Sequence, residues 1–247
     1  MIPYSDPSEP QHLTPFVNAS LIAVNFAVFF YELHEQSIGQ LNHFYLSYSV
    51  IPCEIFQRCH DFSGAPQPVY LTIVTSMFMH AGWLHILGNM IFLWVFGDNV
   101  ENAMGHWRYL IFYLACGVVA AITQSAIDVG STIPSLGASG AIAGVLAAYL
   151  VLLPTAIIRT LVFWFIIPLP VGIYAWVLIG FWFVEQLFSG VTSLGPSAQT
   201  GGVAFFAHIG GFICGLLLVW VLRQPHRVDR MKTYHRRLHG GYGTGPG

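Results

Sequence analysis

Long apolar windows recur along nearly the whole chain, and several approach the roughly 20 residues that a helix needs to cross a bilayer. Only 8% of the 247 residues are charged, against about 25% in a soluble globular domain. Little chain remains for a separate soluble domain. The sequence therefore predicts an all-α polytopic membrane protein embedded in a lipid bilayer.

Segment length and hydropathy predict six spanning helices. The first begins near Thr14, a candidate N-cap before Pro15, and a long polar loop over 35–82 follows it. The prolines in PLP at 168–170 should break any helix, so we expect the fifth span after them. The preceding segment IIRTLVFWFII is expected to be partly inserted or interfacial. The predicted spans cover about 14–32, 83–97, 107–127, 138–153, 171–189 and 203–222.

Basic residues predict the orientation. Six of the nine Lys and Arg lie at or after Arg223, so the C-terminal tail is expected in the cytoplasm. Six spans bring the N-terminus to the same side, where Arg108 and Arg159 also fall, leaving Arg58 outside. The net charge of -2 gives no argument for a nucleic-acid partner. The predicted organisation is a cytoplasmic segment 1–13, a six-helix domain 14–222 and a basic cytoplasmic tail 223–247.

The four cysteines fall into two settings. Cys116 and Cys214 lie in apolar segments, whereas Cys53 and Cys59 lie in a loop, where a disulfide forms only if that loop faces an oxidising compartment. Their spacing matches no metal site, and no metal is predicted. The N-terminus lacks both a signal-peptide n-region and an Arg-rich, Ser-rich transit composition, which favours a bacterial-type plasma membrane over an organelle.

Four polar residues inside the predicted spans are functional candidates, because such groups are costly in lipid: His85, Asn89, Ser139 and His208. Helices two, four and six run in the same direction, so His85, Ser139 and His208 fall at one depth near the outer leaflet. A serine and a histidine brought together there form a nucleophile and its general base. His85 and Asn89, at i and i+4, could both donate hydrogen bonds to an oxyanion.

Glycines predict that two of these helices approach closely. Gly140 and Gly144 form a small-xxx-small pair on the fourth helix, as do Gly211 and Gly215 on the sixth. Packing of these faces would bring Ser139 towards His208. Gly137, just before the serine, would let a substrate carbonyl approach the backbone amides at a helix N-terminus.

Each of these residues also has a purely structural interpretation. A serine among glycines often packs helices, Asn89 could join two helices, and a membrane histidine could hydrogen-bond a neighbour or relay protons. Asp98, Glu101 and Arg108 are interpreted as a solvated or ion-paired connection, and Trp182 as one of the aromatic residues that face lipid or belong to an interfacial belt. No acid is placed to orient His208. A Ser–His dyad oriented by packing is the simpler prediction.

Three sequence motifs in this order resemble the rhomboid intramembrane serine proteases: HILGN with His85 and Asn89, GASG with Ser139, and AHIGGFICG with His208. The resemblance covers about 14–222. It implies a six-helix protease, without metal or organic cofactor, that cleaves in or beside transmembrane segments of other membrane proteins. Ser139 would be the nucleophile and His208 the base, with His85, Asn89 and the Ser139 amide around the oxyanion. The fifth helix would gate substrate entry.

The chain departs from well-known bacterial members of that family in two ways. They place a tyrosine against the catalytic histidine four residues after the serine, where this chain has Ala143, and they carry a Trp-Arg pair in the first loop, which is absent before His85. The packing partner of His208 is therefore open. A catalytically silent client-binding homologue and a histidine-based transporter are the alternative functions. Substrate and oligomeric state are open too.

Overall fold

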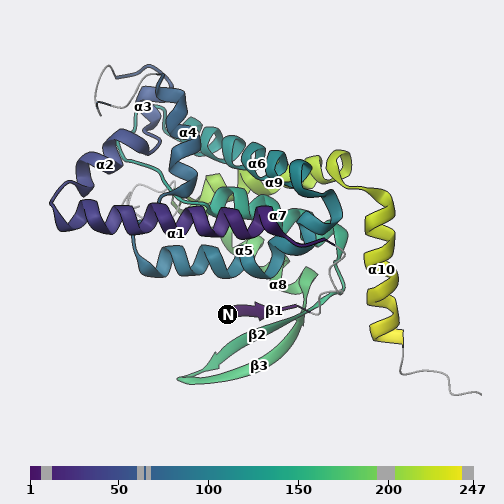
Figure 1. The fold of residues 1–247 in the computed structure, drawn as a ribbon. Helices are drawn as coiled ribbons and strands as arrows, with labels where there is room; N and C mark the ends of the chain where they lie inside the picture. The colour runs from purple at the N-terminus through teal and green to yellow at the C-terminus, as the bar shows by residue number, and fades with distance from the viewer. Residues whose placement is uncertain (7–12, 60–63, 65–67, 194–203, 241–247) are drawn as a thin grey trace, which may run out of the picture.

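The computed structural model describes residues 1–6, 13–59, 64, 68–193 and 204–240, and it is mostly helical (Figure 1). The helices are α1 (Phe16–Ser37), α2 (Leu41–Tyr48), α3 (Pro52–Ile55), η1 (Val69–Leu71), α4 (Thr72–Thr75), η2 (Ser76–Phe78), α5 (Trp83–Met104), α6 (His106–Ile127), α7 (Ser139–Leu152), α8 (Ala175–Thr192), α9 (Phe205–Leu222) and α10 (Pro225–Gly240). The strands are β1 (Ile2–Ser5), β2 (Ile157–Trp164) and β3 (Ile167–Tyr174).

The helical membrane fold is confirmed. Four helices, α1, α6, α8 and α9, are long and apolar enough to span a bilayer, and α5 qualifies together with the segment Val69–Phe78, from which it bends by 81°. The remaining predicted span, the fourth, is α7, a shorter apolar helix of 14 residues. The main boundary errors lie at the ends of α1 and α5, which continue to Ser37 and Met104, beyond the predicted 32 and 97.

The short helix α7 forms the centre of the bundle. Almost all of its residues are buried, and α6 and α9 pack along it. A side-chain carbon added at Gly211 would overlap the carbonyl oxygen of Gly140, and one at Gly215 would overlap that of Gly144. The α7 and α9 backbones are therefore nearly in contact, as the glycine spacing indicated.

Glu101 was predicted to lie in a solvated or ion-paired connection, and its burial rules out the solvated setting. It is fully buried within α5 and accepts hydrogen bonds from the Val17 and Asn18 amides at 3.1 and 2.7 Å. These amides belong to the first turn of α1, where backbone donors have no partner in the helix. Glu101 also contacts His106 Nδ1 at 2.5 Å. The predicted side-chain cap by Thr14 is wrong, and a carboxylate far along the chain replaces it.

A three-stranded antiparallel sheet, in the order β1-β2-β3, was not expected from the sequence. β2 and β3 form a hairpin between α7 and α8, and β1 pairs with the base of β2, with Ile2 opposite Leu161. In Figure 1 the hairpin stands apart from the helices and points back towards the end of the molecule where α1 ends. The segment expected to be interfacial is thus mainly strand β2.

The C-terminal tail begins against the end of α5. Gln224 donates from its backbone amide to the Ala103 carbonyl at 2.9 Å and from its side chain to the Met104 carbonyl at 2.7 Å. Near the other terminus, Asp6 accepts a hydrogen bond from Asn99 of α5. Asp6 and Gln224 therefore lie at the same end of the bundle.

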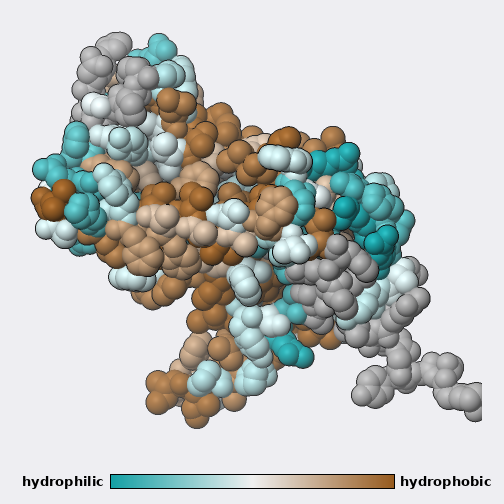
Figure 2. Space-filling model, viewed as in Figure 1, coloured by the Kyte–Doolittle hydropathy of each residue, from teal (hydrophilic) through white to brown (hydrophobic). Residues whose placement is uncertain are grey.

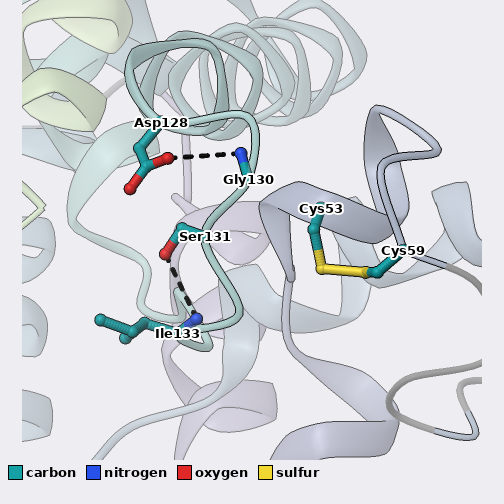
Figure 3. The surroundings of a disulfide bond; sticks show 6 residues. All are labelled: Cys53, Cys59, Asp128, Gly130, Ser131 and Ile133. Carbon is teal, nitrogen blue, oxygen red and sulfur yellow. Dashed lines mark hydrogen bonds between the residues drawn. A yellow bond between two sulfur atoms is a disulfide. The ribbon is translucent and has the colours of Figure 1, made fainter.

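The predicted polar loop over 35–82 contains several short helices that pack above α6 and α7. Cys53 and Cys59 form a disulfide within it (Figure 3). Val50 pairs with Ser135 through two backbone hydrogen bonds, and the Cys53 amide donates to the Ser131 carbonyl at 3.0 Å. These bonds tie the loop to the segment that leads into Ser139.

Candidate active site

Ser139 and His208 lie within hydrogen-bonding distance. Ser139 Oγ is 2.8 Å from His208 Nε2, across the contact between α7 and α9. Ser139 is the first residue of α7 and His208 lies in the first turn of α9, so the glycine-mediated contact brings both helix starts together. His208 is 7% exposed. This is the distance at which a histidine can take a proton from a serine hydroxyl.

The other ring nitrogen of His208 meets Gln186 of α8. His208 Nδ1 lies 2.6 Å from Gln186 Oε1, and the Gln186 side chain is buried. If Nε2 accepts the proton of Ser139, Nδ1 carries the hydrogen and donates it to the amide oxygen. The prediction that packing alone orients His208 is therefore wrong, because a polar side chain holds the ring as well.

Gln186 is itself held by its neighbours on α8. Its amide nitrogen donates to the Glu185 carboxylate, which also accepts a hydrogen bond of 3.1 Å from Ser189 Oγ. The amide oxygen of Gln186 is consequently directed at His208 and its nitrogen away from it. A series of hydrogen bonds therefore runs from Glu185 through Gln186 to His208, and His208 contacts Ser139.

Trp182 packs against the histidine ring. Their ring centroids are 5.7 Å apart, and Trp182 lies one helical turn before Gln186, so both side chains leave the same face of α8. Trp182 also contacts Phe212 of α9. Its interpretation as a lipid-facing aromatic is therefore wrong. It is the ring neighbour of His208 in a chain that has the small, fully buried Ala143 one turn after the serine.

His85 lies beside the turn that precedes Ser139. A side-chain carbon at Gly137 would come within 2.9 Å of His85 Nε2 and 3.8 Å of Ser139 Oγ, so the missing side chain leaves room for both groups. Gly137 has a φ of +130°, which L side chains rarely adopt. Its amide donates to the Ser76 carbonyl at 2.8 Å. His85, Gly137 and Ser139 thus line one small region.

Asn89 is engaged by a residue that the sequence analysis missed. Its side-chain nitrogen lies 2.9 Å from His80 Nε2, and His80 is fully buried. An amide nitrogen carries two hydrogens, so this contact still leaves one for another acceptor. The ring of His80 also lies 5.0 Å from that of His85. His80 therefore positions both predicted oxyanion donors.

The backbone around His80 is fixed by two side chains. The His80 amide donates to both carboxylate oxygens of Glu32, at 3.0 and 3.2 Å, and its carbonyl accepts from the Tyr45 hydroxyl at 3.2 Å. Burial raises the pKa of Tyr45 to about 12, and Glu32 adds to this, so the hydroxyl remains a donor. Applied to the first span, the rule that singled out His85 would have found Glu32 and, through it, this network.

Comparison with known proteins places the chain in a family. The Rhomboid domain family model matches residues 67–225. "Rhomboid protein 1, mitochondrial" from Saccharomyces cerevisiae is 28% identical over 166 residues, which cover 66% of this chain and 44% of that protein. "Rhomboid-like protein 11, chloroplastic" from Arabidopsis thaliana is 29% identical over 164 residues, covering 63% of this chain and 53% of the relative.

A third relative, "Presenilin-associated rhomboid-like protein A, mitochondrial" from Danio rerio, is 31% identical over 167 residues, which cover 63% of this chain and 40% of that protein. The match thus spans about half or less of the length of these relatives. The family model, in contrast, covers well over half of this chain and includes His85, Asn89, Ser139 and His208. The chain belongs to the rhomboid family.

Proposed function

We propose that this protein is an intramembrane serine endopeptidase that hydrolyses peptide bonds in or near the transmembrane segments of other membrane proteins. The observation that carries the proposal is the 2.8 Å contact between Ser139 Oγ and His208 Nε2, on a histidine whose other nitrogen meets Gln186. The proposed protease domain is 14–222, between a short N-terminal segment and the tail 223–247.

In the proposed reaction Ser139 Oγ attacks the scissile carbonyl carbon while His208 Nε2 takes the hydroxyl proton. The resulting imidazolium gives that proton to the leaving amine as the C–N bond breaks, which leaves an acyl ester on Ser139. A water molecule, deprotonated by His208, then attacks the ester carbonyl carbon. His208 gives that proton to Ser139 Oγ as the ester C–O bond breaks, which releases the new carboxyl end and restores the serine. Gln186 accepts a hydrogen bond from Nδ1 throughout and keeps Nε2 directed at the serine.

His85, Asn89 and the Ser139 backbone amide are the proposed donors to the oxyanion. Amides in the first turn of a helix have no partner within the helix, so that of Ser139 is suited to this role. His85 is adjacent through the space at Gly137, and Asn89 keeps a second amide hydrogen. Donors fixed before the reaction stabilise the developing charge without rearranging.

The proposed orientation places both termini in the cytoplasm, because six of the nine basic residues lie at or after Arg223. The active site then lies near the opposite face, and substrates are proteins with a transmembrane segment. The bacterial-type plasma membrane remains our sequence-based proposal for the compartment, whereas the relatives named above are called mitochondrial or chloroplastic. Fractionation of the source cells, with protease protection of an added C-terminal tag, tests both points.

The test of the proposed function compares the wild type with Ser139→Ala on a single-span substrate in lipid, with fragments resolved on a gel. Only the wild type should cleave, and both proteins should unfold at the same temperature. Ser125→Ala is the matched control, because this buried serine donates to the Ala121 carbonyl of its own helix. Cleavage by Ser139→Ala would contradict the proposal. Absence of both cleavage and labelling of Ser139 by a fluorophosphonate would favour the client-binding alternative.

Cleavage should depend on pH through the histidine. A protonated His208 cannot accept the Ser139 proton, so the rate should fall about tenfold per pH unit on the acid side. The measurement is the initial cleavage rate from about pH 4 to 9, with the folded fraction followed by circular dichroism at each pH. A flat profile from a protein that stays folded would argue against this role of His208.

A further inference from the structure

The tip of the β2–β3 hairpin is the most exposed apolar part of the described chain outside the helices. Trp164, Phe165 and Ile166 are 68, 86 and 90% exposed, and Phe163 and Ile167 beside them are exposed too. Figure 2 shows hydrophobic residues gathered at this tip. Both faces of the hairpin are apolar there, so one protein surface could cover only half of them. A fluid apolar phase would cover both.

The turn at the tip lacks the residues that turns of this kind normally contain. Trp164 pairs with Ile167, so Phe165 and Ile166 form a two-residue turn, a place usually occupied by Asn-Gly or another Gly pair. Phe165 has a φ of +55°, which is unfavourable for a bulky side chain. Two large apolar residues thus occupy a strained turn, in a place where a hairpin that faces water normally has polar residues.

The open edge of the hairpin also lacks donors near the tip. Pro168 and Pro170 occupy alternate positions of β3, opposite Phe163 and Leu161. Proline has no N–H, so the outer edge of β3 loses the donors that an uncovered strand would expose. An unpaired donor is costly in an apolar medium, and its removal makes insertion of the edge cheaper.

The base of the hairpin is fixed between the end of α7 and the start of α8. The Ala175 amide donates to the Ala156 carbonyl at 2.8 Å, and the Trp176 amide donates to the Pro154 carbonyl at 3.0 Å. Ile158 and Thr160 are buried, and β1 covers the other edge of β2. From this base the tip turns back along the bundle (Figure 1). Residues 160–184 contain no Asp, Glu, Lys or Arg.

We propose that the β2–β3 hairpin is a membrane anchor whose tip inserts among the lipids of the leaflet at the end of α7, at the boundary between head groups and acyl chains. The partner is the acyl-chain region of the bilayer. Insertion holds the connection that leads directly into α8, the helix that carries Trp182 and Gln186. Insertion of the hairpin does not require protease activity, so its test is independent of the test of the proposed function.

The test measures depth with a spin label in the full-length protein in phosphatidylcholine nanodiscs, whose two faces are both open to water. The label is attached through Ile166→Cys, in a background with Cys116→Ala and Cys214→Ala. Its matched control is Arg159→Cys, at the exposed base of the same strand. We expect oxygen, which concentrates in lipid, to relax the Ile166 label severalfold more than a water-soluble nickel chelate does. The order should reverse at position 159.

Two outcomes would overturn the anchor. Equal access of the nickel chelate to both labels would place the tip in water. Protection of the Ile166 label from both reagents would mean that protein covers the tip. A second measurement avoids the cysteine variants: lipids brominated near the head-group end of the acyl chains should quench the difference in fluorescence between wild type and Trp164→Phe. Quenching of that difference by aqueous iodide instead would also contradict insertion.

Discussion

The helix that carries His208, α9, and the helix that contacts its ring, α8, differ in how they are held. α9 packs on α7 through glycines, with their backbones nearly touching and α7 almost entirely buried. α8 contributes Trp182 and Gln186 to the histidine, but Trp176, Phe181 and Phe188 on the same helix are exposed. The proposed nucleophile and base are thus joined by a contact in which the two backbones leave no room for movement. The groups that orient the base come from a helix with one free side.

This difference suggests how the site can be both fixed and accessible. In a close-packed interior, small displacements are costly, so the spacing of Ser139 and His208 is set by the α7–α9 contact. The hydrogen bond from His208 to Gln186 lasts only while α8 stays close. If α8 moves to admit a substrate, the histidine loses its orienting partner until the helix returns.

The largest expected effect follows from the addition of one carbon atom at the close contact between α7 and α9. Gly211→Ala should cost about 3 kcal/mol of stability or more, because the new carbon overlaps the Gly140 carbonyl oxygen and backbone cannot move aside cheaply. Cleavage should be lost with it. Gly180→Ala makes the same change on α8, where nothing lies within 4 Å of the added carbon. Thermal unfolding in detergent compares the two variants. Equal unfolding temperatures would contradict the difference in packing between α9 and α8.

The second effect isolates the orienting hydrogen bond. Gln186→Leu should lower kcat about 10- to 100-fold with little change in KM or unfolding temperature, because the histidine loses its acceptor while the volume is kept. The dependence of the cleavage rate on pH should change as well, because Nδ1 of His208 no longer has this acceptor. The exchange Glu185→Gln with Gln186→Glu keeps an acceptor for Nδ1 and should restore most of the rate.

Ser189→Ala is the control on α8, since Ser189 touches Glu185 and not the histidine. If Gln186 only supports packing, the exchanged pair should be as slow as Gln186→Leu, and the pH profile should keep its shape. That result would leave Trp182 as the sole orienting contact from α8.

The smallest effect concerns the ring contact. Trp182→Leu should reduce the cleavage rate about 3- to 10-fold, since an aromatic contact of this kind contributes about 0.5–1.5 kcal/mol. Trp176→Leu changes an exposed tryptophan on the same helix and should leave the rate unchanged. Initial rates at saturating substrate distinguish the two variants. Equal rates would show that the ring contact does not orient His208.

The contact between Ser139 and His208 could be predicted because it depends on short, local patterns. A serine that opens a glycine-rich helix and a histidine one turn into another define matching depths, and small-xxx-small spacing implies which faces meet. Gln186 could not be placed in this way, since its role depends on how α8 is rotated about its axis. Its position one turn after Trp182 was the available signal, together with the cost of a buried amide in a span.

The hairpin was missed for a related reason. The prolines of PLP correctly excluded a helix over 168–170. The turn of the hairpin, however, lacks the Asn-Gly or Asp-Gly pair from which a hairpin can be predicted. The partners of Glu101 and Glu32 were hidden for another reason. Each carboxylate serves backbone amides that lie far along the chain, and hydropathy carries no information about such pairs.

The pairing of Ile2 with Leu161 also sets an order of events during synthesis. The first strand leaves the ribosome long before its partner exists. At about 5–20 residues per second, roughly 10 to 30 s pass before the β2 sequence has been made. The sheet can therefore close only after the helix that carries Ser139 has been synthesised, and the first strand stays available to other binding partners, chaperones included, throughout that interval.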